Sequence, residues 1–167
     1  MASDDKPLRV SRGFVDGIPH NKALGIKVVE FRRAEAIFEL PYDTKLVGNP
    51  DTGVLHGGAI TALLDACSGA AVFAALTEWQ PIATLDLRID YLRTGDVDRA
   101  IRAKATCYRI TRNVAFTRAI AYHDDDEADP IASSVGTFML GTKPAGGVGG
   151  TGLGTTGPAS GSKKDAP

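Results

Sequence analysis

An almost unbroken apolar stretch, residues 57–76, is the feature that most constrains how this chain can fold. Its only charged residue is Asp65. A helix that is apolar nearly all round must be buried on most of its sides. The stretch is long enough to span a bilayer, but Ala and Gly dominate it, Asp65 lies mid-span, and no positively charged flanks accompany it. We therefore expect the core helix of a globular domain and no membrane partner.

Strand patterns surround this helix, and their order predicts the fold class. A short helix over 12–21 comes first, and residues 42–55 form a loop before the long helix. The six expected strands are 24–31, 35–40, 82–92, 100–108, 113–123 and 130–140. Consecutive strands joined by short turns favour an antiparallel sheet. The sequence therefore predicts an α+β fold with a curved antiparallel sheet wrapped around one long helix.

Composition changes after residue 142. Segment 143–167 is rich in glycine with Thr, Ser and Pro, and it offers almost nothing apolar to bury. We interpret 1–142 as one folded domain and 143–167 as a flexible tail. The length of 167 residues also suits a single domain.

Charge and cysteine content narrow the partners and the compartment. The formal net charge is −1, and a nucleic-acid partner would require a basic surface. The only cysteines, Cys67 and Cys107, form no disulfide framework, and no apolar secretory segment begins the sequence. We expect a cytoplasmic protein with free thiols.

Two features of the long helix point to attack on a carbonyl group. His56-Gly57-Gly58 leaves backbone N–H groups bare at the helix start, where they can hold developing negative charge. Asp65 is costly to ionise in an apolar helix unless it is paired or used. Along the axis, Gly58 and Asp65 are roughly 10 Å apart, at about 1.5 Å per residue. One copy cannot present both to one substrate, so the chemistry requires two antiparallel copies. The alternative is structural: a tight turn before the helix, and an Asp bonded to nearby backbone.

Other reactive residues show no comparable pattern. The three histidines lack metal-ligand spacing, which argues against a metal site. Cys67 is followed by Ser-Gly, but no G-x-S-x-G is present, and the thiol lies in a buried helical pattern. Residues 82–92 alternate strictly, which places Thr84 on the side opposite the apolar row of the strand.

The residues around the helix resemble the hot-dog-fold acyl-CoA thioesterases. The resemblance rests on Asn49-Pro-Asp-Thr-Gly53-Val-Leu-His56-Gly57-Gly58, then Asp65, then the strand from Ala83 to Arg93. Within this family the sequence most resembles the phenylacetate-pathway subgroup with its His-Gly-Gly motif. The resemblance covers about residues 12–141. His-Gly-Gly alone is a weak signal, but a carboxylate nine residues after the His makes the match more specific.

The resemblance implies a fold, an assembly and an activity. It implies a homodimer with edge-to-edge sheets, often paired again into a tetramer, that hydrolyses acyl-CoA without a metal or organic cofactor. The N–H of Gly57 would polarise the thioester carbonyl, and Asp65 of the opposite subunit would act as base or nucleophile. Thr84 would help place the water, and Asn49 would contribute. The Asn of the family usually lies six residues before the His, whereas Asn49 lies seven before it, so its role departs from the pattern.

The remaining candidates carry alternatives. His56 orients the loop in our interpretation, either by capping the helix or by bonding a carbonyl. Gly58 is a candidate for binding substrate. Three residues at strand ends or turns are candidates for binding the CoA phosphates, and the alternative is that they are ordinary solvated side chains. These three are Arg93, Arg112 and Asn113.

Two other functions remain open on the same fold. One is a non-catalytic acyl-CoA-binding or regulatory dimer. The other is an acyl-CoA hydratase or dehydratase, which needs a His–carboxylate pair near the α and β carbons, and the only candidate His lies within His-Gly-Gly. The acyl chain itself, aromatic or medium-length, is not determined by the sequence.

Overall fold

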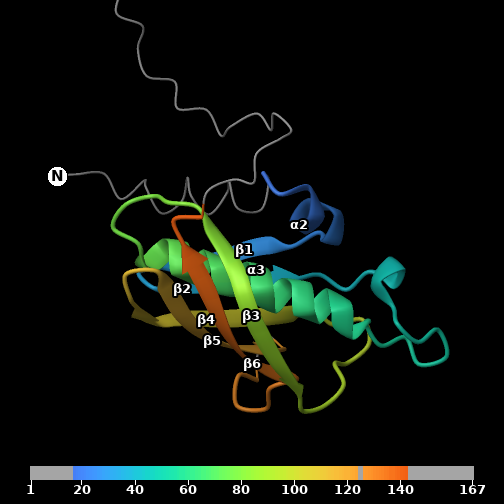
Figure 1. Cartoon of the computed structure of the whole chain (residues 1–167). Helices are drawn as coiled ribbons and strands as arrows, with labels where there is room; N and C mark the ends of the chain where they lie inside the picture. Colours follow the sequence, from blue (N-terminus) through green and yellow to red (C-terminus); the bar gives the residue numbers. More distant parts are fainter. Residues whose placement is uncertain (1–16, 124–125, 143–167) are drawn as a thin grey trace, which may run out of the picture.

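A six-stranded antiparallel sheet with one long helix across it forms the body of the protein (Figure 1). The computed structural model describes residues 17–123 and 126–142. The helices are α2 (Pro19–Leu24), the 3-10 turn η1 (Thr44–Leu46) and α3 (Gly57–Ala75). The strands are β1 (Lys27–Arg32), β2 (Glu35–Leu40), β3 (Ile82–Tyr91), β4 (Ile101–Ile110), β5 (Val114–Tyr122) and β6 (Ala132–Leu140).

The sheet order places β3 at one edge. Neighbouring strands follow the order β1-β2-β4-β5-β6-β3, and all of the pairs are antiparallel. β3 pairs with β6 alone, so the other side of β3 faces no strand of the described chain. This architecture is the α+β hot-dog arrangement that the resemblance implied.

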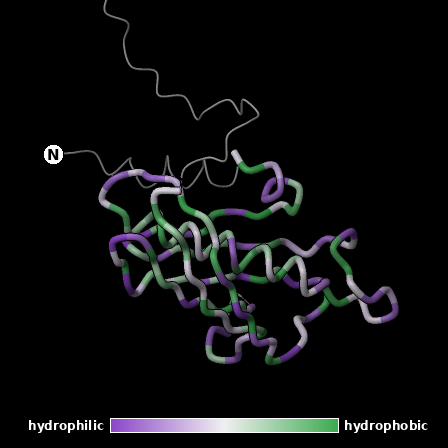
Figure 2. Tube along the Cα trace, viewed as in Figure 1, coloured by the Kyte–Doolittle hydropathy of each residue, from purple (hydrophilic) through white to green (hydrophobic). Residues whose placement is uncertain are grey.

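Small side chains let α3 lie close to the sheet. The buried residues of β4 and β5, the strands that α3 contacts most along with β2, are mainly alanines, and the helix itself is built largely from Ala and Gly. Figure 2 shows the mixed polar and apolar colouring of the chain around this helix. The approach is close enough for the Cys67 thiol to lie 3.2 Å from both the Ala36 and Ala103 carbonyl oxygens. Larger side chains fill the rest of the core. They include Phe38, Leu40, Leu63, Leu64, Ile101 and Phe138.

Burial of α3 supports its assignment as a core helix. Its length and apolar composition would suit a membrane span, yet 61% of the stretch is buried inside the protein. Burial raises the pKa of the Cys67 thiol to about 12. The interpretation of this cysteine as a packing residue therefore agrees with the structure.

Two local expectations were wrong. The N-terminal helix was expected over 12–21 with Pro19 near its end, but Pro19 is the first residue of α2, which ends at Leu24. Proline suits a first helical position because it has no N–H to leave unpaired. The part of the expected helix before residue 17, and the tail 143–167, lie outside the described residues.

The second correction concerns the face of Thr84. Strict alternation would direct Thr84 and Tyr91 to opposite faces of β3, yet both hydroxyls contact α3. The register with β6 shifts between Thr84 and Asp86, so one extra residue enters β3 at this bulge. The side-chain alternation is therefore offset by one residue. Leu85, expected in the apolar row, is 51% exposed.

Candidate active site

The start of α3 is shaped by its two glycines. His56 is the N-cap, and its Nδ1 accepts a hydrogen bond from the Gly58 N–H at 2.9 Å. A Cβ on Gly58 would lie only 2.8 Å from that Nδ1, so the cap requires glycine there. A Cβ on Gly57 would come within 3.1 Å of the Tyr91 hydroxyl oxygen. Each glycine thus allows one side chain to approach the helix end closely.

The capping bond also limits what His56 can do. Because Nδ1 accepts the Gly58 N–H, the neutral ring carries its proton on Nε2. Of the two roles considered for His56, the structure shows the capping of the helix. Its use as an acid–base partner at an acyl chain would break the cap, which disfavours the hydratase alternative.

The Gly57 N–H is left for a ligand. The neighbouring amides are satisfied, Gly58 by His56 and Ala59 by the His56 carbonyl at 2.9 Å. Among residues 17–123 and 126–142, no acceptor is recorded for the Gly57 N–H. Its position at the first residue of α3 adds the positive end of the helix dipole. The arrangement can stabilise an oxyanion.

Asp65 lies two turns further along α3 and is paired with Thr84. The Thr84 hydroxyl donates to Asp65 Oδ1 at 2.9 Å. The hydroxyl fixes the orientation of the carboxylate and leaves Oδ2 for other partners. The bulge in β3 makes this contact, because it turns Thr84 toward the helix.

A mostly apolar cavity of about 410 Å³ opens beside this pair. It runs along α3 from Asp65 past Gly69 to Phe73, and α2 and the sheet close its sides. The lining residues from those sides include Ile18, His20, Ile82 and Phe138. A second cavity of about 350 Å³ near His56 and Gly58 shares His20 and Ala62 with the first. Together they place a carboxylate in the lining of a mostly apolar groove.

Gly57 faces a different opening. A pocket of about 360 Å³ is lined by Gly57, Tyr91 and the loop that follows β3. Asp65 follows Gly57 by eight positions of helix, about 12 Å along the axis. One copy of the chain therefore presents the Gly57 N–H and the Asp65 carboxylate to different openings.

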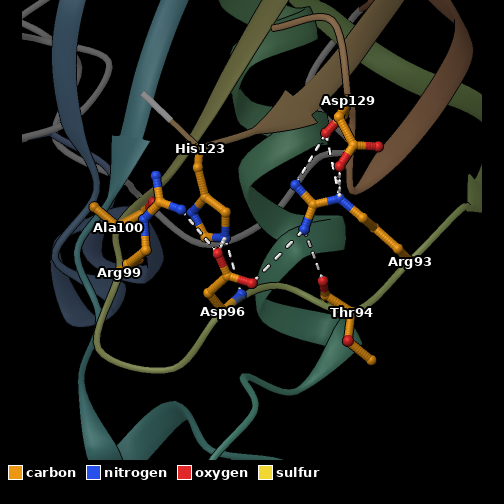
Figure 3. Close-up of polar contacts among 7 residues, drawn as sticks. All are labelled: Arg93, Thr94, Asp96, Arg99, Ala100, His123 and Asp129. Carbon is orange, nitrogen blue, oxygen red and sulfur yellow. Dashed lines mark hydrogen bonds and ion pairs between the residues drawn. The ribbon is translucent and has the colours of Figure 1, made fainter. Parts of the chain in front are cut away.

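The candidate CoA-binding residues do not gather in one place. Arg93 is held by two carboxylates, 2.7 Å from Asp129 and 3.9 Å from Asp96, and it also donates to the Asp129 and Thr94 carbonyls (Figure 3). Arg112 and Asn113 are exposed in the turn between β4 and β5. The Asn113 carbonyl accepts from Leu140 N, at the end of the sheet away from Arg93. Binding of phosphates by these residues stays a prediction.

Asn49 has a local role in the structure. Its Oδ1 accepts the Asp51 N–H at 3.0 Å, and its carbonyl accepts the N–H groups of Thr52 and Gly53. It lines none of the three cavities beside Asp65, His56 and Gly57. The catalytic part predicted for Asn49 stays a prediction, and its visible role is to hold this turn.

Two residues were missed or misread from the sequence. Tyr91, on the apolar row of its strand, donates to the Gly57 carbonyl at 2.6 Å; a hydroxyl in an otherwise apolar row was the available signal. His123 was weighed from the sequence as a metal ligand, yet its side chain is only 1% exposed. Its Nε2 accepts the Asp96 N–H, and its Nδ1 contacts the Ala100 carbonyl (Figure 3). His123 thus ties the loop after β3 to the end of β5.

Metal ligation has no visible basis here. Within the described ranges, 17–123 and 126–142, no group of three His, Cys, Asp or Glu side chains is arranged to hold a metal ion. The geometry that the structure does show is a carboxylate–hydroxyl pair at an apolar groove, and a bare N–H at a helix start.

Comparison with known proteins connects this geometry to a family. Residues 52–129 match the thioesterase superfamily. A medium/long-chain acyl-CoA thioesterase, YigI, of Salmonella typhimurium is 33% identical over 145 residues, covering 79% of this chain and 92% of the relative. The chain belongs to the thioesterase superfamily. The matched segment contains Gly57, Asp65 and Thr84. The protein is a thioester hydrolase.

Solved structures agree on the fold. A protein from Pseudomonas aeruginosa is 41% identical, with a TM-score of 0.72 and coverage of 79% of this chain and 97% of that one. The PaaI protein from the phenylacetic acid degradation operon of Escherichia coli is 17% identical, with a TM-score of 0.71 and coverage of 81% and 93%. The second likeness shows the hot-dog fold alone.

Proposed function

We propose that this protein hydrolyses acyl-CoA thioesters at sites shared between two protomers. The observation that carries the proposal is the contact between Thr84 and Asp65 in the lining of a mostly apolar groove. Relatives named acyl-CoA thioesterases support the substrate class. The products would be the free carboxylic acid and CoA.

The shared site follows from the distance along α3. Gly57 and Asp65 lie about 12 Å apart on one helix, too far to act on one carbonyl group. β3 offers an edge that pairs with no strand of the described chain. Leu85 within it and Leu92 just after it are exposed apolar side chains. A second copy pairing antiparallel along β3 would join two sheets into one. A twofold axis at the middle of β3 would bring the Thr84 end of one protomer beside the Tyr91 end of the other.

Each residue then has a defined task. The Gly57 N–H of one protomer would hold the thioester oxygen as negative charge develops on it. Asp65 of the other would take a proton from water as the water oxygen bonds to the carbonyl carbon, or attack that carbon itself. Thr84 would keep the carboxylate oriented. In either route the C–S bond breaks, and the CoA sulfur leaves as a thiolate that takes up a proton. Where Asp65 attacks directly, the acyl group stays on its carboxylate as a mixed anhydride, and water then hydrolyses this anhydride to the free acid and restores Asp65.

The groove beside Asp65 supports an apolar acyl group. Asp65, Gly69 and Phe73 lie four residues apart on one face of α3, about 12 Å from first to last. With Phe73 and Phe138 in its lining, the groove suits a medium-length chain, in agreement with the name of the YigI relatives. The His-Gly-Gly motif resembles that of the phenylacetate-pathway subgroup, so an aromatic acyl group is the second candidate substrate.

Assembly beyond the dimer and location complete the proposal. Pairing of two dimers into a tetramer is the step that the family resemblance implies. Both cysteines are unpaired and buried, which fits a reducing cytoplasm. CoA would be bound by Gly58 and the basic strand ends, with Arg93 reaching phosphate only if its contacts with Asp96 and Asp129 rearrange.

Thiol release from a panel of acyl-CoAs tests the function. The panel holds short, medium and long chains and phenylacetyl-CoA, and wild type is compared with Asp65→Asn. Glu78→Gln is the matched control, because it neutralises an exposed carboxylate in the loop after α3. We expect turnover in wild type and control and its loss in Asp65→Asn. Acyl-CoA binding without CoA release in wild type would refute hydrolysis and favour the binding-protein alternative.

A further inference from the structure

Tyr91 lies over the first turn of α3 from the end of the edge strand. Its hydroxyl donates to the Gly57 carbonyl at 2.6 Å, and the same oxygen lies 2.9 Å from the Thr61 hydroxyl. A phenol has a single proton to donate. Because that proton is directed to Gly57, the Thr61 hydroxyl must be the donor to Tyr91. A chain of two hydrogen bonds therefore runs from Thr61 through Tyr91 to Gly57.

This chain acts on the peptide that neighbours the bare N–H. The peptide between Gly57 and Gly58 is held at both ends, its carbonyl by Tyr91 and its N–H by His56. The preceding peptide, between His56 and Gly57, carries the N–H with no recorded acceptor among residues 17–123 and 126–142. Two clamps on one peptide limit rotation at the Gly57 Cα, where glycine would otherwise allow the most freedom.

We propose that Tyr91 is a positioning residue, which aims the Gly57 N–H at the thioester oxygen. The inference rests on the proposed function. The close approach of the ring explains residue 57 independently, since a Cβ there would lie 3.1 Å from the Tyr91 oxygen. Tyr91 and Gly57 also line the same pocket, so the clamp borders the space where the carbonyl would lie.

Removal of the hydroxyl alone tests this role. Tyr91→Phe keeps the ring over Gly57 and deletes both hydrogen bonds. We expect kcat to fall roughly 10- to 100-fold, with KM little changed. A misaimed donor stabilises the transition state less, while the binding of the substrate in its ground state is nearly unaffected. Tyr108→Phe is the matched control, since it removes the hydroxyl of another half-exposed tyrosine, on β4. The control should keep wild-type kinetics.

Several outcomes would overturn the inference. They are an unchanged kcat in Tyr91→Phe, an effect confined to KM, or an equal loss in Tyr108→Phe. Circular dichroism and gel filtration check fold and assembly. If Tyr91→Phe does not fold, Thr61→Val interrupts the same chain, and it should also lower kcat; wild-type kinetics there would count against the role.

The contact itself is tested without turnover. Loss of the hydrogen bond to the Gly57 carbonyl should shift the backbone amide resonance of Gly58, which shares that peptide, and Tyr108→Phe should leave it in place. If wild type releases no CoA from any substrate, the proposed function fails, while this shift still decides whether Tyr91 holds the peptide. An unmoved Gly58 resonance in Tyr91→Phe would overturn the inference.

Discussion

Replacing Thr84 by valine tests whether the bulge in β3 serves the reaction. Valine keeps the shape of threonine and removes the hydroxyl that donates to Asp65 at 2.9 Å. Hydrogen bonds to charged groups contribute about 1.5–3 kcal/mol, and the partly exposed pair belongs at the lower end. About 1.5 kcal/mol of lost orientation corresponds to roughly a 10-fold decrease in kcat.

The assay is initial-rate CoA release, measured on the best substrate of the panel. Thr84→Ser is the matched variant, because it keeps the hydroxyl and deletes only the methyl group. We expect Thr84→Ser to retain most of the wild-type kcat while Thr84→Val loses about tenfold. Equal rates for Thr84→Val and wild type would refute the reasoning, since the carboxylate would then need no partner. Equal losses in both variants would assign Thr84 to packing.

The remaining predictions concern stability and reactivity. Gly58→Ala places a Cβ 2.8 Å from His56 Nδ1, so the cap should break at a cost of about 1 kcal/mol, measured as the free energy of unfolding in urea. His123→Ala removes a buried ring and takes away the partner of the part-buried Asp96 N–H and Ala100 carbonyl, and should lower that free energy by about 2 kcal/mol. The Cys67 thiol, with its pKa raised from 9.0 to about 12 by burial, should resist iodoacetamide at pH 8 until the protein is unfolded. Because the unfolded thiol ionises first, its contribution to stability should fall between pH 9 and 12; rapid native alkylation would contradict the burial.

Much of the fold could be predicted from hydrophobic patterning. An apolar run with one carboxylate gives a buried helix, and α3 spans Gly57–Ala75 against the expected 57–76. The six strands follow because alternation and turns are local signals. The first helix was expected over 12–21 but begins at Pro19, because proline favours the start of a helix over its interior or end.

The site was harder to predict because its contacts depend on pairing between distant strands. The face of Thr84 is set by the bulge, which exists only in the register of β3 with β6. The role of His123 could not be read from its neighbours in sequence, because its partners, Asp96 and Ala100, lie more than twenty residues earlier. The helix start was more accessible, since the His56 cap and the glycines depend on neighbours in sequence.

The central claim is that Gly57 of one protomer acts with Asp65 of the other. It is tested by mixing two inactive variants, Asp65→Asn and Gly57→Pro. Proline removes the N–H of residue 57, and its fixed φ suits a first helical position. Its Cβ would also press on the Tyr91 hydroxyl, which lies 3.1 Å from a Cβ placed at residue 57, so both changes disable the same site. Each homodimer should be inactive. A heterodimer purified through two different tags would contain one site with both defects and one site with neither.

Turnover of the heterodimer on acyl-CoA decides the matter. If the sites are shared, the intact site should restore about half of the wild-type rate per dimer, because one of two sites works. If each protomer contained its own complete site, every site in the heterodimer would carry a defect. A heterodimer as inactive as its parents would therefore contradict the account.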